Sequence, residues 1–468
     1  MSLAIVWFRR DLRLADNPAL TAALAAHDSV LPLYIHAPEE EAPWAPGAAS
    51  AWWLHQALDD LRAQLGGRLL LRRGASLTVL EELLAQTGAR AVYWNRLYEP
   101  AAIARDTQVK QVLRAADVAA ESHNAALLFE PWAVQKKSGG PFRVFTPFWR
   151  QLQMLGLPDR PLPAPPLQGR LHDPAGLGGE SLDALALLPT IRWDEGIAAA
   201  WHPSRAGAEA RLDEFLASAL PHYAEGRDRP AKPHVSRLSP YLHFGQLGPR
   251  EVVAATREVR QLAGDFLREL GWREFAHHLL YHYPHTSDAP MDERFSVFPW
   301  RDDEAGLQAW QRGETGIPLV DAGMRELWVT GWMHNRVRMI VASFLTKNLL
   351  LPWLSGARWF WDTLVDADLA ANSLGWQWTA GCGADAAPYF RVFNPVLQGQ
   401  KFDPHGDYVR TWLPALGRLP DKWIHRPWEA DDAVLAAADV RLGRDYPRPI
   451  VDLGESRRRA LVAWDKVK

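Results

Sequence analysis

The sequence contains only one cysteine, Cys382, among 468 residues. A single thiol excludes an internal disulfide, so the fold must depend on its hydrophobic core, and we expect the protein to reside in the reducing cytoplasm. The first residues form a strand-like run rather than a charged and then apolar leader, which favours the same compartment. Long hydrophobic runs are also lacking. Lys347 and Asn348 interrupt the apolar stretch 339–354, so we expect neither a membrane-spanning segment nor a membrane partner.

The sequence also lacks an excess of one charge. It has 52 Lys and Arg against 55 Asp and Glu, a formal net charge of −3, so any binding of nucleic acid must depend on a local basic surface. A glycine-rich G-x-G-x-x-G turn is missing after the first predicted strand, where the sequence reads WFRRDLRLADNPAL. A standard dinucleotide site at that turn is therefore not supported.

The sequence is long and apolar enough for two domains, because 48% of its residues are hydrophobic and 23% are charged. In residues 1–130, apolar runs alternate with amphipathic helical stretches. This alternation predicts a Rossmann-like α/β domain, in which helices cover both faces of a parallel sheet. The predicted strands are 3–8, 30–36, 68–71, 91–95 and 125–129, and predicted helices include 50–65 and 76–86, the latter with Ser76 as its N-cap.

Residues 131–200 are predicted to link the domains. Their second half contains the proline cluster PDRPLPAPP and a glycine-rich patch at 176–179, and it has little periodicity. Residues 201–468 have the helical period instead and are predicted to form a large all-α domain. Its longest predicted helices are 207–220, 248–260, 264–283, 321–330 and 332–351.

One helical segment, RELGWREFAHHLLYHYP, places Glu269, Trp272, Arg273 and Ala276 on a single stripe. A carboxylate beside a tryptophan is in itself more typical of a surface acid next to a packed aromatic. Gly271 in mid-helix destabilises the helix relative to alanine, which is easier to accept where another group approaches the backbone closely.

A second segment, WMHNRVRMIVASFLTKN, has an apolar stripe suited to the core and another stripe of mixed character. The mixed stripe consists of Asn335, Arg338, Met339 and Ala342. An amide, a guanidinium, a thioether and a methyl group make a poor core, so this stripe predicts the wall of a pocket.

A third segment, DADLAANSLGWQWTAGCGADAAPYFRVFNP, is rich in small residues that let a planar ligand approach. Its larger members include Asp366, Asp368, Asn372, Trp376 and Trp378. No further carboxylate or histidine lies at a useful spacing from the two aspartates, so no metal site is predicted here. A carboxylate pair for hydrolysis stays open as a weaker interpretation.

Taken together in this order, these segments resemble the photolyase/cryptochrome family. WFRRDLRLADNPAL resembles the start of the family's antenna domain, HVSRLSPYLHFGQLGPREV resembles its flavin-phosphate segment, and GWREF, TGWMHNRVRM and the block 366–395 follow. The resemblance covers nearly the whole chain except the linker. It implies a U-shaped FAD in the helical domain, and it places this chain nearest to bacterial enzymes that repair cyclobutane pyrimidine dimers.

The resemblance assigns a flavin role to eleven residues. The residues that match cofactor-binding positions are Tyr223, Val235, Ser236, Arg237, Leu238, Ser239, Arg338, Asp366, Ala367, Asp368 and Asn372. Val235 stands where a threonine is common in the family, so one hydroxyl contact is missing. Arg338 is expected to pair with Asp366. Asn372 matches the residue that faces flavin N5, where plant cryptochromes are expected to carry aspartate and animal ones cysteine.

In the mechanism that the resemblance implies, excited reduced FAD passes an electron to a flipped-out dimer in single- or double-stranded UV-damaged DNA. The resemblance also implies which residues take part. The residues expected around the lesion are Glu269, Trp272, Asn335, Met339 and Trp378, with Arg227, Arg336 and Lys401 on DNA phosphates. Trp376, Trp353 and Trp300 match the family's electron relay to the surface. For these three, core packing is the alternative that the sequence leaves open.

The resemblance leaves the identity of the antenna chromophore open. Ala101 and Ala102 replace an asparagine–glutamate pair of some folate-binding relatives, whereas the segment 139–150, GGPFRVFTPFWR, resembles relatives near the plant cryptochromes. Methenyltetrahydrofolate is therefore favoured, with a deazaflavin, another flavin or no antenna as alternatives. A signalling cryptochrome and a (6-4) photoproduct photolyase are the rival functions. Glu269, Asn335, Met339, Asn372 and the short carboxyl-terminal end argue against the cryptochrome, and Asn335 and Met339 stand where a (6-4) photolyase is expected to carry histidines. We expect a monomer.

Overall fold

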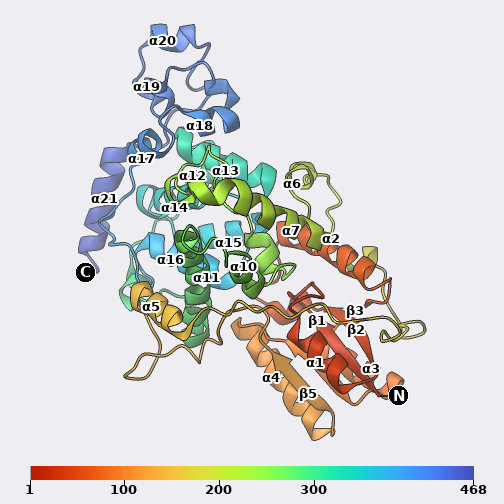
Figure 1. Cartoon of the computed structure of the whole chain (residues 1–468). Helices are drawn as coiled ribbons and strands as arrows, with labels where there is room; N and C mark the ends of the chain where they lie inside the picture. Colours follow the sequence, from red (N-terminus) through yellow and green to blue (C-terminus); the bar gives the residue numbers. More distant parts are fainter. Residues whose placement is uncertain (1) are drawn as a thin grey trace.

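The computed structural model describes residues 2–468 and has an α/β domain followed by a larger helical domain (Figure 1). The predicted fold class is confirmed. The elements of the first domain are β1 (Leu3–Phe8), α1 (Pro18–Ala26), β2 (Ser29–His36), α2 (Ala48–Gln64), β3 (Leu70–Arg73), α3 (Ser76–Thr87), β4 (Ala91–Asn95), α4 (Pro100–Ala115) and β5 (Ala119–His123).

The sheet is fully parallel, with strand order β3-β2-β1-β4-β5. Residues 4–8 of β1 and all of β4 are buried, as parallel strands covered on both faces require. The strand order reverses between β1 and β4, and in such sheets ligands bind beyond the carboxyl ends of the strands at that point. The motif WFRRDLRLADNPAL begins within β1 and continues into the loop at this edge.

Two local predictions for this domain are wrong. The fifth strand is Ala119–His123, not 125–129. The apolar run 125–129 is held in an extended loop by the helical domain, because Glu274 accepts hydrogen bonds from the amides of Leu128 (3.0 Å) and Phe129 (3.2 Å). Ser76 is the first helical residue rather than the N-cap, and its amide and hydroxyl both donate to Glu40.

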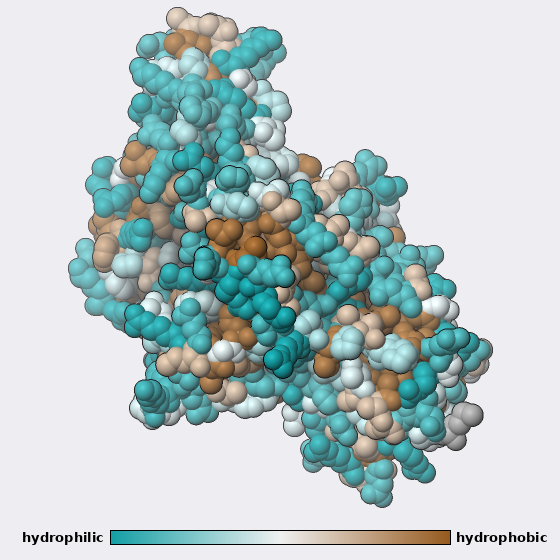
Figure 2. All heavy atoms as spheres, in the orientation of Figure 1, coloured by the Kyte–Doolittle hydropathy of each residue, from teal (hydrophilic) through white to brown (hydrophobic). Residues whose placement is uncertain are grey.

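The second domain is built from helices around α11 and α16, which pack against each other. The helices after α5 (Phe145–Leu155) are α6 (Glu195–Ala200), α7 (Arg205–Glu214), α8 (Tyr223–Gly226), α9 (Ser239–His243), α10 (Pro249–Ala255), α11 (Gly264–His282), α12 (Glu304–Arg312), α13 (Pro318–Thr330), α14 (Asn335–Ser343), α15 (Trp353–Thr363), α16 (Leu369–Ala380), α17 (Pro395–Phe402), α18 (Asp407–Trp412), α19 (Asp421–Ile424), α20 (Asp432–Ala437) and α21 (Leu453–Asp465). Figure 2 shows a hydrophobic area near the centre of this domain, surrounded by hydrophilic side chains.

Two of the predicted helices end in π-helical turns. The predicted helix 207–220 becomes α7 followed by the π turn Phe215–Ala219, and 332–351 becomes α14 followed by the π turn Phe344–Leu349. Single π turns are typical of functional sites because they re-aim side chains within a helix.

The connecting segment contains helix α5, a long extended stretch and, at its end, helix α6. Helix α5 packs against α11, so this part of residues 131–200 belongs to the packing of the helical domain. The extended stretch then crosses the α/β domain (Figure 1) and hydrogen-bonds to it. The amide of His172 donates to the carbonyl of Val30 (2.8 Å), and that of Glu180 donates to the carbonyl of Leu71 (2.8 Å).

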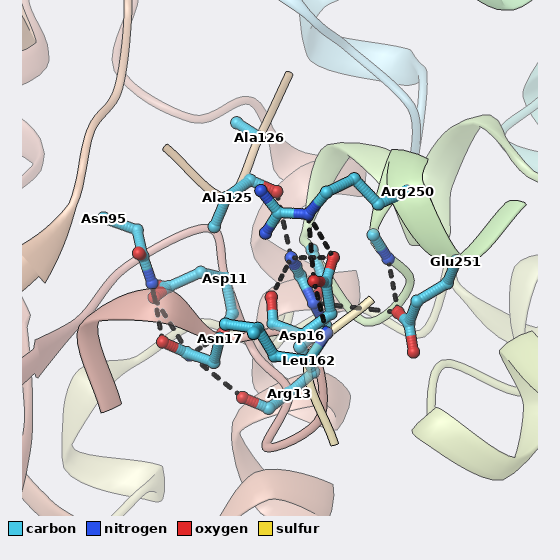
Figure 3. Close-up of polar contacts among 12 residues, drawn as sticks. Asp11, Arg13, Asp16, Asn17, Asn95, Ala125, Ala126, Leu162, Arg250 and Glu251 are labelled. Atoms are coloured by element: carbon cyan, nitrogen blue, oxygen red, sulfur yellow. Dashed lines mark hydrogen bonds and ion pairs between the residues drawn. The ribbon is translucent and has the colours of Figure 1, made fainter. Parts of the chain in front are cut away.

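A buried polar network fastens the two domains together (Figure 3). Arg13 donates to the carbonyls of Gly245 (2.8 Å) and Ala125 (2.9 Å), and Asp16 accepts from Arg250 at 2.9 Å. Arg13 is 1% exposed and Asp16 is fully buried. A buried charge without its partner is strongly destabilising, so these pairs fix the relative position of the domains. Arg13 and Asp16 of WFRRDLRLADNPAL thus form an interdomain lock.

Candidate functional site

A pocket opens in the helical domain where α14, α16 and the loop before α16 meet. It is lined by Asn335, Arg338, Met339, Ala342, Phe360, Leu364, Asp366, Ala367, Asp368, Ala371, Asn372, Gly375, Trp376 and Thr379. The whole mixed stripe of α14 faces this pocket, which confirms the pocket wall predicted from its spacing. The pocket also brings together the second and third segments, which lie about thirty residues apart in the chain.

The wall formed by α16 is suited to a planar ligand. A Cβ atom added to Gly375 meets nothing within 4 Å, so this helix offers bare backbone to the pocket. The Asn372 amide donates to the carbonyl of Ala357 at 2.9 Å, which leaves its oxygen available as an acceptor. On the same helix Trp376 is buried, and its indole N–H has no partner within residues 2–468. Open faces and a few polar groups are typical of cofactor sites.

Charged groups on one side of the pocket are mutually paired. Arg338 donates to both oxygens of Asp366, at 3.1 and 2.9 Å, as predicted. Ser239 donates to the same carboxylate at 2.6 Å, so the predicted phosphate segment adjoins the pocket. Arg338 is held in place by a further bond from its Nε to the carbonyl of Met333 (2.7 Å).

The predicted phosphate segment has an unusual backbone. Arg237 has φ of +53°, in the left-handed region that a non-glycine residue rarely adopts. Its guanidinium lies between the rings of Trp201 and Trp332, at 4.6 and 4.7 Å, and its Nε has no partner within residues 2–468. A strained backbone with an unpaired donor is typical of a ligand-binding loop. Val235 and Arg237 line a second hollow together with Lys232.

Three of the residues predicted to contact DNA or the lesion take part in two ion pairs. Arg227 bonds to Glu269 at 2.7 Å, and Arg336 bonds to Asp228 at 2.7 Å. Arg336 also lies 3.8 Å from the sulfur of Met339, which lines the pocket. Arg336 therefore connects the second ion pair to the pocket wall.

Other predicted residues lie close to Arg227 and Arg336. Tyr223 is buried, and its ring lies 5.6 Å from the guanidinium of Arg227. Phe402, at the end of α17, lies between Arg336 (4.5 Å) and Lys401 (5.0 Å). Lys401 is exposed and has no carboxylate partner within residues 2–468, so it can meet an external anion directly.

The two tryptophans predicted to flank the lesion are both half-buried. Trp272 stacks on Phe145 of α5 with centroids 3.8 Å apart and planes 9° apart. One face of Trp272 is therefore covered, and the stacking fixes its ring plane. The sequence did not indicate this contact, because α5 lies within the predicted linker.

The predicted relay tryptophans lie in one aromatic region. Trp376 packs so closely on α15 that a Cβ atom at Gly356 would lie 2.1 Å from its ring. Trp353 lies one turn before Gly356 on the same face of α15. Arg301, next to Trp300, donates from its amide to the carbonyl of Leu350 at 2.8 Å. Trp300 is half-buried, whereas Trp353 and Trp376 are buried, and all three border the same hydrophobic core.

Asp368 has a different role from Asp366. Its carboxylate caps α16 through the amide of Ala371 (2.8 Å) and contacts His277 at 3.3 Å and His243 at 3.5 Å. Burial tends to raise the pKa of Asp368, but the two histidines outweigh it and hold that pKa well below the usual value. The sequence did not single out His243 or His277.

Glu326 is a further group that the sequence did not indicate. It is 7% exposed and lines the second hollow, beside Arg237. Burial raises the pKa of Glu326 to about 7, although the hydroxyl of Tyr408 (2.6 Å) donates to it. A glutamate on the buried face of α13 gives no signal in the sequence, because its partner lies 82 residues away.

The α/β domain has two hollows at the carboxyl edge of its sheet. The first is lined by residues that include Arg9, Arg10, His36 and Ala367. The second, larger and more open, has aromatic and basic walls, formed by Trp94, Tyr98, Trp132, Tyr281, Arg96, Lys110 and Arg114 among others. Among residues 2–468, the segment 139–150 lines neither hollow and packs on α11 instead.

The described chain has neither a metal-binding cluster nor a membrane-spanning helix. Residues 2–468 contain no group of three or more His, Cys, Asp or Glu side chains placed to hold a metal ion. None of the helices in this range combines the length and apolar character needed to cross a bilayer.

Two family models match the chain. The model described as DNA photolyase matches residues 4–166, and the FAD binding domain of DNA photolyase matches residues 266–466. Both models lie where the structure has its α/β domain and its pocket-bearing helical domain.

Individual relatives cover the whole chain. It is 48% identical to "Deoxyribodipyrimidine photo-lyase" of Agrobacterium fabrum, over 99% of this chain and 98% of that protein. It is 42% identical to "Cryptochrome-1" of Arabidopsis thaliana, over 97% of this chain and 69% of that protein. Among solved structures, a bacterial class III photolyase from Agrobacterium tumefaciens matches with a TM-score of 0.95 and 47% identity, covering 100% of this chain and 98% of that one.

Proposed function

Because the chain belongs to the photolyase/cryptochrome family and has its FAD-binding domain, we propose that it is a deoxyribodipyrimidine photo-lyase that repairs cyclobutane pyrimidine dimers in DNA under light. The observation that carries this proposal is one pocket in which Asn335, Met339 and Asn372 share the wall, with Arg336 in contact with Met339. Photolyase relatives at 37–48% identity over nearly the full length support it.

The residues of the pocket fit FAD. Arg338 and Asp366 hold each other beside small residues that leave room for a flat ring, and the segment 236–239 presents hydroxyls and an unpaired guanidinium nitrogen for phosphates. The chemistry that the bound flavin supplies is transfer of one electron from its excited reduced form to the dimer, with return of the electron after the cyclobutane ring has split. The Asn372 oxygen is the acceptor available to a ring N–H.

The lesion is held by groups at the mouth. Trp272, whose plane is fixed by Phe145, and Trp378 provide apolar faces for a dimer flipped out of the duplex, a step that is easier for a damaged base. Glu269 is aimed by Arg227, and its carboxylate accepts hydrogen bonds from the pyrimidine edge. Asn335 donates from its amide and stabilises the negative charge that develops on the dimer, whereas the Glu269 carboxylate fixes the orientation of the pyrimidine.

The basic groups bind the DNA backbone. Arg227, Arg336 and Lys401 each contact a phosphate, and Lys401 lies with Arg336 around the ring of Phe402. Arg336 exchanges the carboxylate of Asp228 for a phosphate on binding, whereas Arg227 keeps its bond to Glu269, so the net gain for Arg336 is smaller than for a free cation. Lys401 makes no such exchange.

Trp300, Trp353 and Trp376 pass electrons, in that order, from the surface to oxidised flavin. Each tryptophan is more buried than the one before it. The supporting observation is the packing of Trp376 between the pocket and α15.

The antenna is methenyltetrahydrofolate, held in the larger hollow of the α/β domain. Trp94, Trp132 and Tyr98 provide faces for a pterin ring, and Arg96 and Lys110 are suited to the carboxylates of a glutamate tail. The assignment predicts that purified wild-type protein releases folate on denaturation. It also predicts that the Trp132→Ala variant is purified without that folate. Release of a deazaflavin or a second flavin would contradict it.

A signalling cryptochrome is the second candidate, because the Arabidopsis cryptochromes are 41–42% identical to this chain. The deciding experiment illuminates the FAD-loaded protein with oligonucleotides that carry either a cyclobutane dimer or a (6-4) photoproduct. Light-dependent restoration of the first alone is expected, and a Glu269→Gln variant should restore it more slowly than a Glu209→Gln variant on exposed α7. Binding without restoration of either lesion would favour the cryptochrome.

A further inference from the structure

A cluster of ionisable side chains lies between the flavin pocket and the smaller hollow of the α/β domain. Ala367 lines both cavities, so the wall between them is thin. Beside it, Asp368 belongs to the flavin pocket and His243 belongs to the hollow. His277, from α11, touches Asp368 from a third side. The cluster therefore connects two cavities that are otherwise separate.

An oxygen acceptor faces each ring nitrogen of His277, which favours a proton on both nitrogens. Its Nδ1 faces the carbonyl of Arg273 at 3.0 Å, and its Nε2 faces the carboxylate of Asp368 at 3.3 Å. A neutral imidazole has only one N–H, so it satisfies only one of these two acceptors. His277 is 4% exposed, so water cannot replace the missing bond easily.

The surrounding charges agree with this proton placement. The charged groups that face His277 are Asp368, Glu99, Arg273 and Glu274, with Arg10 paired to Glu99. Burial lowers the pKa of His277, but Asp368 outweighs it, so the pKa is raised from the usual 6.5. Burial lowers the pKa of His243, so the proton resides on His277 and not on His243. Among residues 2–468, one buried oxygen of Glu99 has no partner, which leaves it free to accept a proton or a water.

We propose that His277, Asp368 and His243 form a proton relay that serves the flavin during its photoreduction. This step rests on the proposed function. When bound flavin is photoreduced, one electron would come from Trp376, and an external thiol reductant would return one electron to the tryptophan. One proton leaves Nε2 of His277 and reaches the pocket through the carboxylate of Asp368, and a proton from the hollow passes through His243 to restore His277.

The relay acts only while oxidised flavin is being reduced. Dimer repair returns its electron and needs no net proton, so flavin that is already reduced bypasses the relay. This separates the relay from the repair reaction and from the DNA-binding residues.

The test is flash photoreduction of the FAD-loaded protein with a thiol reductant, followed by visible absorption that separates protonated from anionic one-electron-reduced flavin. In the wild type, protonation should slow as pH rises through the raised pKa of His277 and should show a solvent deuterium isotope effect. In His277→Gln, protonation should slow by on the order of 10²-fold and lose that pH dependence. His282→Gln is the matched control, because His282 lies on the same helix but faces the carbonyl of Pro131.

Protonation at the wild-type rate in His277→Gln, or a wild-type rate that is independent of pH and of deuterium, overturns the relay. Should His277→Gln fail to fold, the wild-type pH and isotope profiles decide alone. Dithionite-reduced His277→Gln is expected to repair dimers at the wild-type rate. Failure of dithionite-reduced wild type to repair would instead contradict the proposed function.

Discussion

Replacing Gly375 by alanine should have opposite effects on the protein without and with FAD. Gly375 lies inside α16, and an added Cβ atom meets nothing within 4 Å when the pocket holds no ligand. Alanine is favoured over glycine within a helix by about 0.8–1.0 kcal/mol. The flavin-free protein should therefore gain about 1 kcal/mol, which raises Tm by roughly 2–4 °C for a domain of this size.

The same methyl group points into the space assigned to the flavin ring. Inserting a methyl group into a well-packed contact destabilises it by about 1–3 kcal/mol, so FAD should bind roughly 5- to 150-fold more weakly. The two effects are separable because the first is measured by circular dichroism on flavin-free protein, and the second by titration with FAD.

Two further glycines serve as controls. Gly264→Ala, at the exposed start of α11, also meets no neighbour and should leave FAD affinity unchanged. Gly356→Ala should destabilise even the flavin-free protein, because its Cβ would lie 2.1 Å from Trp376. Unchanged FAD affinity in Gly375→Ala would show that the flavin lies elsewhere and would refute the pocket assignment.

Three other predictions concern DNA, light and pH. Lys401→Ala should weaken binding to damaged DNA and reduce the slope of log K against log salt by about 1, whereas an unchanged slope would exclude a phosphate contact. Trp376→Phe should photoreduce its flavin much more slowly, while the dithionite-reduced variant should still repair dimers. A normal photoreduction rate would contradict the role of Trp376 in the electron relay. Glu326 has its folded pKa raised to about 7 from 4.5, so stability should fall as pH rises between these values, by about 3 kcal/mol in total. Glu326→Gln should flatten that fall in denaturant titrations, and an unaltered pH profile would disprove the assignment.

The sequence predicted those parts of the fold that depend on local periodicity. Strands β1 and β4 are buried on both faces, so their continuous apolar runs mark them clearly. Strand β5, AAESH, is polar and lies at the sheet edge, whereas the apolar run after it is not a strand. That run is apolar because it packs under α11, whose Arg273 and Glu274 bind its backbone. No local pattern records a partner 146 residues away.

The candidate site divides in the same way. The α14 stripe of Asn335, Arg338 and Met339 was predictable, because helical spacing alone puts these side chains on one face. The stacking of Phe145 on Trp272 and the contact of His277 with Asp368 were not, since each joins elements far apart in the chain. The roles of individual residues in repair stay predictions, because geometry shows where the side chains lie and not what they do to a dimer.

The stretch that crosses the α/β domain has a practical consequence for handling the protein. It is hydrogen-bonded to the sheet both before and after the exposed turn at 174–176, through His172 and Glu180. Arg13 and Arg250 clamp the two domains independently of this stretch. A protease nick at that turn should therefore yield two fragments that still migrate as one particle in gel filtration. The same position is suited to building a split version of the protein from two separately expressed halves.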